Sequence, residues 1–269
     1  MDRFVSPLLA LFASFSASAA DTLARPEWQK HFDAKGVRGT FALFEPAKDR
    51  YLVFNEARAR QRFIPASTFK IANALIGLEV GSIADEDEVF TWDGKPKLRP
   101  AWERDQALAS GMRESTVWMF QEIARRTGKE RMQEWLDRLD YGNKDMKGGI
   151  DLFWLQGGLR VSAFEQVDFL RKLSEGGLPM TQRSQRLVRN ALVVEKTPAH
   201  TLYAKTGSSG AISNPVSWWV GWIERKGRPA AYFAMNFTPG AKTRHEDRFD
   251  IARAILGEAG ALPIESRPS

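Results

Sequence analysis

Ser67 and Lys70 lie three residues apart within an otherwise apolar stretch of the chain. The apolar residues around them recur with helical spacing, and Pro65 suits the first turn of a helix because its missing N–H costs nothing there. The pattern predicts a helix from Pro65 to about Gly81, buried on most of its surface, with Ser67 and Lys70 on one face. Burial disfavours a charged lysine. A neutral amine beside a serine hydroxyl at a helix start can activate that serine as a nucleophile.

A Ser-x-x-Lys spacing also arises by chance in a chain of this length. Ser67 could then be an ordinary helix cap, and Lys70 could extend its amine to the surface along a buried stem. The rest of the chain has to decide between these interpretations. Three more short polar motifs follow in order: Ser115-Thr116-Val117, Tyr141-Gly142-Asn143 and Lys205-Thr206-Gly207.

Alternating side chains and turn residues predict strands near both ends of the chain and few between residues 82 and 200. The predicted strands are Gly39–Phe44, Tyr51–Phe54, Thr201–Thr206, Ser217–Ile223 and Ala230–Phe237. Further helices are predicted at Ser115–Arg126, Lys129–Leu139, Ser162–Glu175, Thr181–Val193 and Asp247–Leu256. We therefore expect an α+β fold: an antiparallel sheet of about five or more strands from both chain ends, with flanking helices and an inserted all-helical region. A cleft between the sheet and the helices is the natural place for a site.

The composition excludes several function classes. The chain has no cysteine, so we expect neither disulfides nor thiolate chemistry. The three histidines, His31, His200 and His245, show no metal-binding spacing, and no metal site is expected. The net charge is +6, but lysine and arginine are interspersed with 33 acidic residues. We therefore expect no nucleic-acid partner.

Residues 1–20 have the composition of a secretory signal peptide. Arg3 precedes an apolar stretch that reaches Phe15, and Ala17 to Ala20 offer small residues for cleavage. The alternative is a helix on the surface of the mature protein. No later segment has the roughly eighteen consecutive apolar residues of a membrane span, so we expect no stable membrane insertion after the signal is removed.

The four motifs together carry a family resemblance. Ser-x-x-Lys, Ser-Asp-Asn and Lys-Thr-Gly are the signature of penicillin-binding proteins and class A β-lactamases. Here Ser115-Thr116-Val117 stands in place of Ser-Asp-Asn, and Tyr-Gly-Asn and Trp154-Leu155-Gln156-Gly157 follow it. That variant resembles the class D serine β-lactamases, the oxacillinases, over essentially the whole mature chain.

The resemblance implies one serine β-lactamase domain over residues 21–269, with 21–65 and 200–269 in the sheet layer and 66–199 mostly helical. It implies hydrolysis of small-molecule β-lactams, hence β-lactam resistance, by a periplasmic protein. The resemblance also implies that Ser67 is the nucleophile and that Lys70 is the general base. In this family that lysine is carbamylated by carbon dioxide, and no other cofactor is expected.

Further roles are implied by the same resemblance. Ser115 would pass a proton to the β-lactam nitrogen, although it could instead simply cap the helix over 115–126. Lys205 would help to set up this proton path. Trp154 would donate its indole N–H to the carbamate, or else be an ordinary core tryptophan. Val117, which has no polar atom, would keep the carbamate dry.

The substrate-binding residues implied by the resemblance come from the end of the chain. Lys205 and Thr206 would face the cleft from an edge strand, with Gly207 beside them, and help to hold the substrate carboxylate. The backbone N–H groups of Ser67 and Ser208 would form the oxyanion hole. Arg248 would bind the carboxylate, although it could also be a solvated surface arginine.

Two rival interpretations share Ser67, Lys70 and Lys205. A penicillin-binding transpeptidase would have asparagine at position 117 and usually a further domain or anchor. A β-lactam sensor would form the acyl-enzyme and keep it, and such sensors hang from a membrane domain. The substrate spectrum depends on the loops around Trp102, Met112 and Ser209, and the sequence does not set the oligomeric state.

Overall fold

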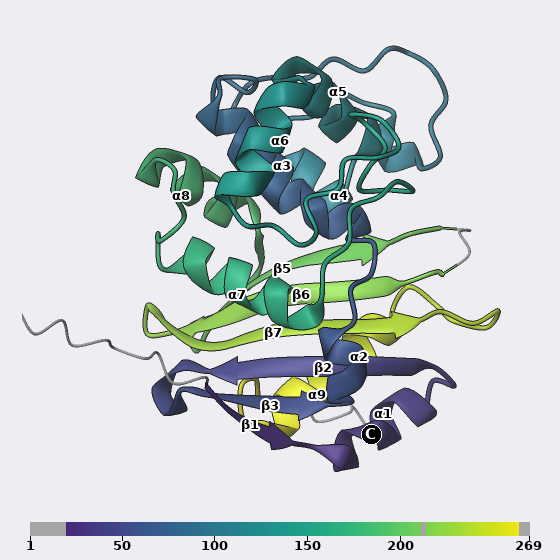
Figure 1. The fold of residues 1–269 in the computed structure, drawn as a ribbon, viewed down its shortest axis with the longest axis vertical. Coiled ribbons are helices and arrows are strands. Elements are labelled where there is room, and N and C mark those ends of the chain that lie inside the picture. Colours follow the sequence, from purple (N-terminus) through teal and green to yellow (C-terminus); the bar gives the residue numbers. More distant parts are fainter. Residues whose placement is uncertain (1–19, 211–213, 264–269) are drawn as a thin grey trace, which may run out of the picture.

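A mixed sheet lies between two groups of helices, one on each of its faces (Figure 1). The computed structural model describes residues 20–210 and 214–263. Its seven strands are ordered β1-β3-β2-β7-β6-β5-β4. Their bounds are β1 (Asp21–Ala24), β2 (Arg38–Glu45), β3 (Arg50–Phe54), β4 (Val193–Lys196), β5 (Thr201–Ser208), β6 (Ser217–Arg225) and β7 (Arg228–Thr238).

The two chain ends meet in the middle of this sheet, as predicted. β2 pairs antiparallel with β7, and Ala42 lies opposite Ala234. Alternate residues of these strands enter two separate cores, so each strand is buried on both faces. β1 was not predicted; it is exposed throughout and forms one edge of the sheet, where it pairs with β3 in parallel, the exception to the antiparallel pairing.

Helices cover both faces of the sheet (Figure 1). On one face α1 and α9 pack with the even-numbered residues of β5, and on the other lie α3 and α5 to α8. The helix bounds are α1 (Gln29–Asp33), α2 (Glu56–Arg60), α3 (Lys70–Glu79), α4 (Leu108–Glu114), α5 (Val117–Thr127), α6 (Lys129–Arg138), α7 (Ala163–Ser174), α8 (Gln182–Ala191) and α9 (Asp247–Glu258).

The helix predicted from Pro65 begins differently from the expectation. Residues Ala66–Phe69 form a 3₁₀ turn, and the α-helical part, α3, begins at Lys70. Ala66 has a positive φ of 50°, which bends the chain at the entry to the turn. Every residue of α3 except Glu79 is buried, so the prediction of a helix buried on most of its surface is confirmed.

Two other boundaries differ from the prediction. The helix predicted from Ser115 begins at Val117, because Ser115 ends the preceding helix α4 in a left-handed conformation, with φ 57° and ψ 41°. Ser115 is therefore not the N-cap of the helix that follows it. The predicted helical region also ends early, since Val193 starts strand β4 beside β5.

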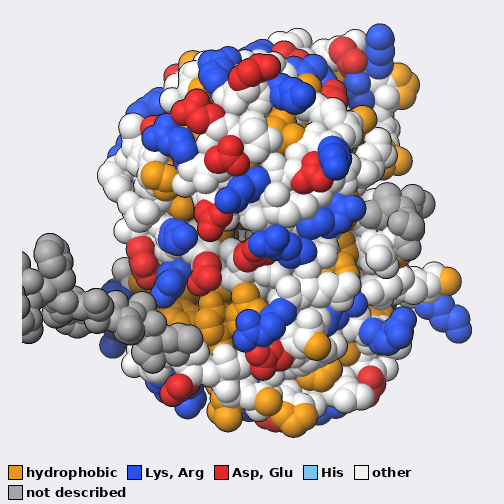
Figure 2. Space-filling model, viewed as in Figure 1, with side chains coloured by type: hydrophobic (Ala, Val, Ile, Leu, Met, Phe, Trp, Pro, Cys, Tyr) orange, Lys and Arg blue, Asp and Glu red, His pale blue; other side chains and the backbone are white. Residues whose placement is uncertain are grey.

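The predicted signal peptide, residues 1–20, lies almost entirely outside the described residues. Within residues 20–210 and 214–263, no helix is long and apolar enough to cross a membrane. On the face drawn in Figure 2, lysine and arginine alternate with aspartate and glutamate over the helical layer. On this face the basic side chains are therefore interspersed with acidic ones, as they are in the sequence.

Candidate active site

The Ser67 hydroxyl and the Lys70 amine are in direct contact. Lys70 Nζ lies 2.6 Å from Ser67 Oγ, and the Lys70 side chain is fully buried. The 3₁₀ turn places Ser67 one turn before Lys70, and two bonds fix this turn. Thr68 Oγ1 donates to Pro65 O at 2.8 Å, and Gln166 Nε2 of α7 donates to Thr68 Oγ1 at 2.7 Å. The nucleophile predicted from the sequence thus has a lysine amine beside it.

Lys70 is buried beside the Phe120 ring, and the preceding residue, Phe69, packs against Trp154; we call these three aromatic residues the lysine pocket. The Lys70 amine lies 5.6 Å from the Phe120 ring centroid, and the Phe69 and Trp154 ring centroids are 5.4 Å apart. Burial, assisted by the charge of Lys205, lowers the pKa of Lys70 well below its ordinary value. In the described part of the chain no carboxylate pairs with this amine. The pocket therefore favours the neutral amine.

The Ser115 hydroxyl joins two lysines. Its oxygen lies 3.3 Å from Lys70 Nζ and 2.9 Å from Lys205 Nζ. Burial, and then the charges of Arg248 and Arg99, lower the pKa of Lys205 to about 7. A hydroxyl within hydrogen-bond distance of two amines whose pKa values are lowered can carry a proton from one to the other.

Strand β5 brings Lys205 to this point. Tyr203 packs with the helical layer, whereas Leu202 and Ala204 pack on the α9 side. Because side chains alternate along a strand, Lys205 shares the helical side and Thr206 lies on the α9 side, not beside Lys205 as expected. β5 is also not the edge strand, since β4 pairs with it over residues 201–203.

Gly207 allows β5 to approach the Ser67 turn. A Cβ atom at Gly207 would lie 2.9 Å from Pro65 O and 3.1 Å from Thr68 Cγ2, so a larger residue would force the two elements apart. Glycine is therefore needed at position 207 because of this close approach, and not because the backbone there has a positive φ. It brings the end of β5 next to the nucleophile.

The Ser208 N–H points toward the open side of β5. The N–H of Ala204 donates to Leu192 O at 2.9 Å, and that of Ser209 donates to Val216 O at 3.1 Å, on the β6 side. N–H groups alternate between the two sides of a strand. The Ser208 N–H therefore points away from β6, at a position that β4 does not reach.

Arg248 of α9 lies among backbone carbonyls at the end of β5; we call this group the arginine site. Its Nη1 donates to Gly207 O at 3.1 Å and to Trp218 O at 3.3 Å. Its Nη2 donates to Ser208 Oγ at 3.0 Å, and its Nε donates to His245 O at 2.9 Å. Arg248 is only 4% exposed, and burial lowers its pKa to about 10. It is thus not a solvated surface arginine.

Comparison with known proteins places this site in a family. Residues 29–257 match the family described as penicillin binding protein transpeptidase domain. The chain is 44% identical to the β-lactamase OXA-5 of Pseudomonas aeruginosa over 260 residues, covering 95% of this chain and 96% of that one. It is 42% identical to the β-lactamase OXA-48 of Klebsiella pneumoniae, covering 95% and 96% of the two chains. This chain belongs to the class D serine β-lactamases, the oxacillinases.

Solved structures agree with this assignment. The class D β-lactamase FUS-1 (OXA-85) from Fusobacterium nucleatum subsp. polymorphum superposes with a TM-score of 0.85 at 36% identity. The match covers 89% of this chain and 100% of that one. The class D β-lactamase YbXI from Nostoc superposes with a TM-score of 0.84 at 33% identity, covering 87% and 99%. The fold expected from the sequence is therefore the fold of this family.

In this oxacillinase the Trp154 indole is buried without a partner. Its side chain is fully buried, and its Nε1 has no acceptor among the described residues. A buried N–H without an acceptor costs free energy, so its presence calls for an explanation. Val117, the other apolar residue singled out from the sequence, is half-buried at the start of α5.

The Tyr141-Gly142-Asn143 motif fixes the segment that carries Trp154, a role that spacing alone did not define. Asn143 Nδ2 donates to Gly158 O at 2.9 Å, and its Oδ1 accepts from the Arg160 N–H at 2.7 Å. The Tyr141 ring packs edge-on against Phe69, with centroids 5.6 Å apart. This motif of the oxacillinase therefore holds the Trp154 segment against the Ser67 turn.

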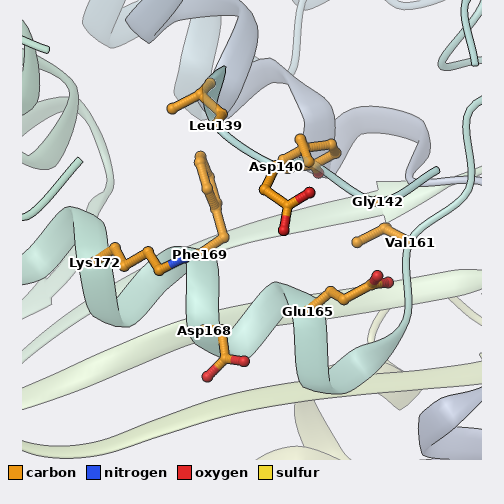
Figure 3. Close-up of a pocket in the computed structure, with 9 residues that line it drawn as sticks. Leu139, Asp140, Gly142, Val161, Glu165, Asp168, Phe169 and Lys172 are labelled. Carbon is orange, nitrogen blue, oxygen red and sulfur yellow. The ribbon is translucent and has the colours of Figure 1, made fainter. Parts of the chain in front are cut away.

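A pocket of about 90 Å³ lies behind this motif, between α7 and the segment after α6 (Figure 3). Its three carboxylates have other partners: Asp168 accepts from Tyr51, Glu165 pairs with Arg62, and Asp140 pairs with Lys144. None of the predicted site residues lines it. Within the described ranges, no group of three His, Asp or Glu side chains is arranged to hold a metal ion.

Proposed function

We propose that this protein hydrolyses β-lactam antibiotics through an acyl-enzyme on Ser67 and so gives its host resistance to them. The observation that carries the proposal is the 2.6 Å contact between Ser67 Oγ and the buried amine of Lys70. Membership of the class D β-lactamases supplies the substrate class. Lys70, the base, then lies within hydrogen-bond distance of both Ser67, the nucleophile, and Ser115, the proton donor.

In the acylation step, Ser67 Oγ gives its proton to the Lys70 side chain and bonds to the β-lactam carbonyl carbon. The backbone N–H groups of Ser67 and Ser208 donate to the carbonyl oxygen as it becomes negative. The lactam C–N bond breaks, and the ring nitrogen takes a proton from Ser115 Oγ. Lys205, 2.9 Å away, replaces that proton.

The substrate is held by its carboxylate at the end of β5. Arg248 offers a guanidinium without an ion-pair partner among the described residues, and its hydrogen bond to Ser208 Oγ directs it toward the strand end. Gly207 accepts from the same guanidinium through its carbonyl oxygen, so the end of β5 forms one side of this carboxylate site. An arginine held in this way binds a carboxylate by charge-assisted hydrogen bonds.

For the hydrolysis step we propose that Lys70 carries a carbamate formed from carbon dioxide. The residues fit this group: burial lowers the pKa of Lys70 and so favours the neutral amine that the reaction with carbon dioxide requires, and the buried Trp154 N–H lacks an acceptor that a carbamate oxygen would provide. When present, the carbamate would supply the base that activates water. Ser67 Oγ then leaves the ester carbon and recovers its proton.

A protein that acylates without fast turnover is the alternative, because the matched family description is that of a penicillin-binding transpeptidase domain. Counting turnovers with a chromogenic cephalosporin separates the two functions. Many product molecules per protein molecule support hydrolysis, whereas one product molecule per protein, with the drug mass retained, identifies a sensor or transpeptidase.

The nucleophile is tested by intact-protein mass spectrometry with a slowly hydrolysed β-lactam. The wild-type protein should gain one drug mass and Ser67→Ala none. Ser174→Ala is the control, because Ser174 is buried against Tyr232 outside the site and should still be acylated. Acylation of the Ser67→Ala protein would show that the nucleophile is another residue.

We also propose that the protein is exported and acts in the periplasm after residues 1–20 are removed. The basic start, the apolar stretch and the small residues before Asp21 support this proposal. Periplasmic protein should begin at or near Asp21 on N-terminal sequencing. A chain that retains Met1 and stays with the cytoplasmic fraction would contradict it.

A further inference from the structure

The proposed mechanism leaves one cationic side chain near the site unused. Arg99 directly precedes the 3₁₀ helix Pro100–Trp102, and its side chain is exposed. Its guanidinium carbon lies 5.9 Å from the centroid of the Trp102 ring, and its carbonyl accepts from the Trp102 N–H at 2.9 Å. Arg99 is therefore tied to Trp102 through both its side chain and its backbone.

Trp102 in turn is fixed beside the proton relay. Its ring is only 9% exposed, and its Nε1 donates to Glu114 O, next to Ser115, at 2.9 Å. The Trp102 carbonyl accepts from Trp118 Nε1 at 2.9 Å. Helices α4 and α5 thus hold the side chain and the backbone of Trp102 in place. Arg99, resting on that indole, lies at the Ser115 end of the site.

No carboxylate neutralises Arg99 within the described residues. The nearby acids are engaged elsewhere, since Glu103 accepts from the Lys97 N–H at 3.0 Å and Glu114 pairs with Arg113 at 3.2 Å. The charge of Arg99 still reaches the site, because it contributes to the lowered pKa of Lys70 and of Lys205. Two guanidinium groups whose charge bears on the site, those of Arg99 and Arg248, therefore have no carboxylate partner among the described residues.

We propose that Arg99 determines specificity by favouring β-lactams whose side chain carries a second anionic group, such as a carboxylate. This inference rests on the proposed function, in which Arg248 takes the carboxylate common to all these substrates. Arg248 is buried and fixed by backbone carbonyls, whereas Arg99 is exposed and free to pair. A substrate with two anions can engage both, and a guanidinium is suited to a carboxylate by its planar pair of donors.

The test compares benzylpenicillin with its α-carboxy analogue, which differs only by the added carboxylate. The measured quantity is kcat/KM for the analogue divided by kcat/KM for benzylpenicillin. The variants are Arg99→Gln, which removes the charge, and Arg99→Lys, which keeps it. Arg138→Gln is the matched control, because Arg138 is also an exposed arginine over an indole, 3.9 Å from the Trp135 ring centroid, but on α6.

We expect Arg99→Gln to lower this ratio about fivefold, chiefly through KM for the analogue, as for a partly screened ion pair. Arg99→Lys should keep most of the ratio, and Arg138→Gln should keep all of it. Raising the salt concentration should bring the wild-type ratio toward that of Arg99→Gln.

An Arg99→Gln protein that hydrolyses both penicillins with the wild-type ratio would overturn the inference while leaving the proposed function intact. An equal loss on both penicillins would also overturn it, because Arg99 would then only support the fold. Were the protein to acylate without turnover, the proposed function would fail, and the same ratio would be measured on acylation rates by mass spectrometry.

Discussion

The lysine pocket and the arginine site both bury a basic side chain at the nucleophile, but their surroundings are opposite. Lys70 lies among aromatic rings, and its partners are two hydroxyls, those of Ser67 and Ser115. Arg248 donates to three backbone carbonyls and a hydroxyl. The lysine pocket favours the neutral amine of Lys70, whereas the arginine site keeps the guanidinium of Arg248 charged.

The two regions differ because one has to transfer protons and the other has to bind the substrate carboxylate. A base must be neutral before it can accept a proton, so the lysine pocket offers no anion and few acceptors. A carboxylate receptor must stay charged, so the arginine site supplies oxygen acceptors without a neutralising carboxylate. Lys205, with its pKa lowered to about 7, lies between the two regions and can exchange protons near neutrality.

The largest effect is expected from Lys70→Met, which keeps the volume of the side chain but removes the amine. Turnover should fall by about a hundredfold to ten-thousandfold, as when a general base is lost. Stability should rise by about 1 kcal/mol or more, because a buried amine is replaced by an apolar group. Thermal unfolding and steady-state kinetics on the same preparation check both parts.

The stability gain of Lys70→Met should itself depend on pH. The pKa of Lys70 is 10.5 in the unfolded chain and is lowered by burial in the folded one, so between these two values Lys70 is protonated when unfolded and neutral when folded. The unfolded state therefore binds the extra proton, and the cost of burying Lys70 falls as the pH rises toward 10.5. A variant less stable than the wild type at every pH would contradict the comparison of the two regions.

Acidification should reduce turnover by a smaller factor. Once the pH is below the lowered pKa of Lys70, each further unit should cost about a factor of ten in neutral amine. Acyl-enzyme should accumulate, and added bicarbonate at constant pH should restore part of the rate. Trp154→Phe should require more bicarbonate for the same rate. Full turnover without carbon dioxide, and no ¹³C NMR signal from a labelled carbamate, would exclude the proposed base.

Arg248→Met tests the other region with the same apolar substitution. KM should rise about tenfold with less change in kcat, because a charge-assisted contact to the substrate is lost. Stability should fall by about 1–3 kcal/mol, since the Gly207 and Trp218 carbonyls lose a donor. This sign is opposite to that of Lys70→Met. If both variants were more stable than the wild type, the distinction between the two regions would fail.

Local patterns predicted the parts of this molecule that depend on neighbours in the sequence. Ser67 and Lys70 share a helix face at a fixed spacing, so their contact followed from periodicity. Strands β5 to β7 are apolar runs bounded by turn residues, and these were predicted as well. β1, which is exposed, and β4, whose first residue Val193 was predicted to end a helix, are short and have no such pattern; each pairs with a single neighbouring strand.

The rest of the site depends on contacts that a sequence pattern does not contain. Arg99 gave no signal beyond preceding a proline, and only the fold brings its charge near Lys205. Asn143 was noticed as part of a motif, but its bonds to Gly158 and Arg160 depend on a loop that returns from far along the chain. Ser115 was mistaken for a helix start, because a serine before an apolar run is the usual sign of one.

The smallest expected effect concerns Ser115, the residue between the two regions. Its backbone is left-handed, with φ 57°, a conformation that costs a residue with a Cβ about 1 kcal/mol and glycine almost nothing. Ser115→Ala and Ser115→Gly both remove the hydroxyl that joins Lys70 to Lys205 and should lose turnover equally.

The two Ser115 variants should nevertheless differ in stability. Ser115→Gly should be the more stable by about 1 kcal/mol, because it removes the strain that serine and alanine share. Equal turnover with unequal stability would mean that the left-handed backbone serves only to place the hydroxyl between the two amines. If Ser115→Gly were instead the less stable variant, the folded backbone would not be strained there, and the position of the relay would have to be explained by packing of α4 against α5 alone.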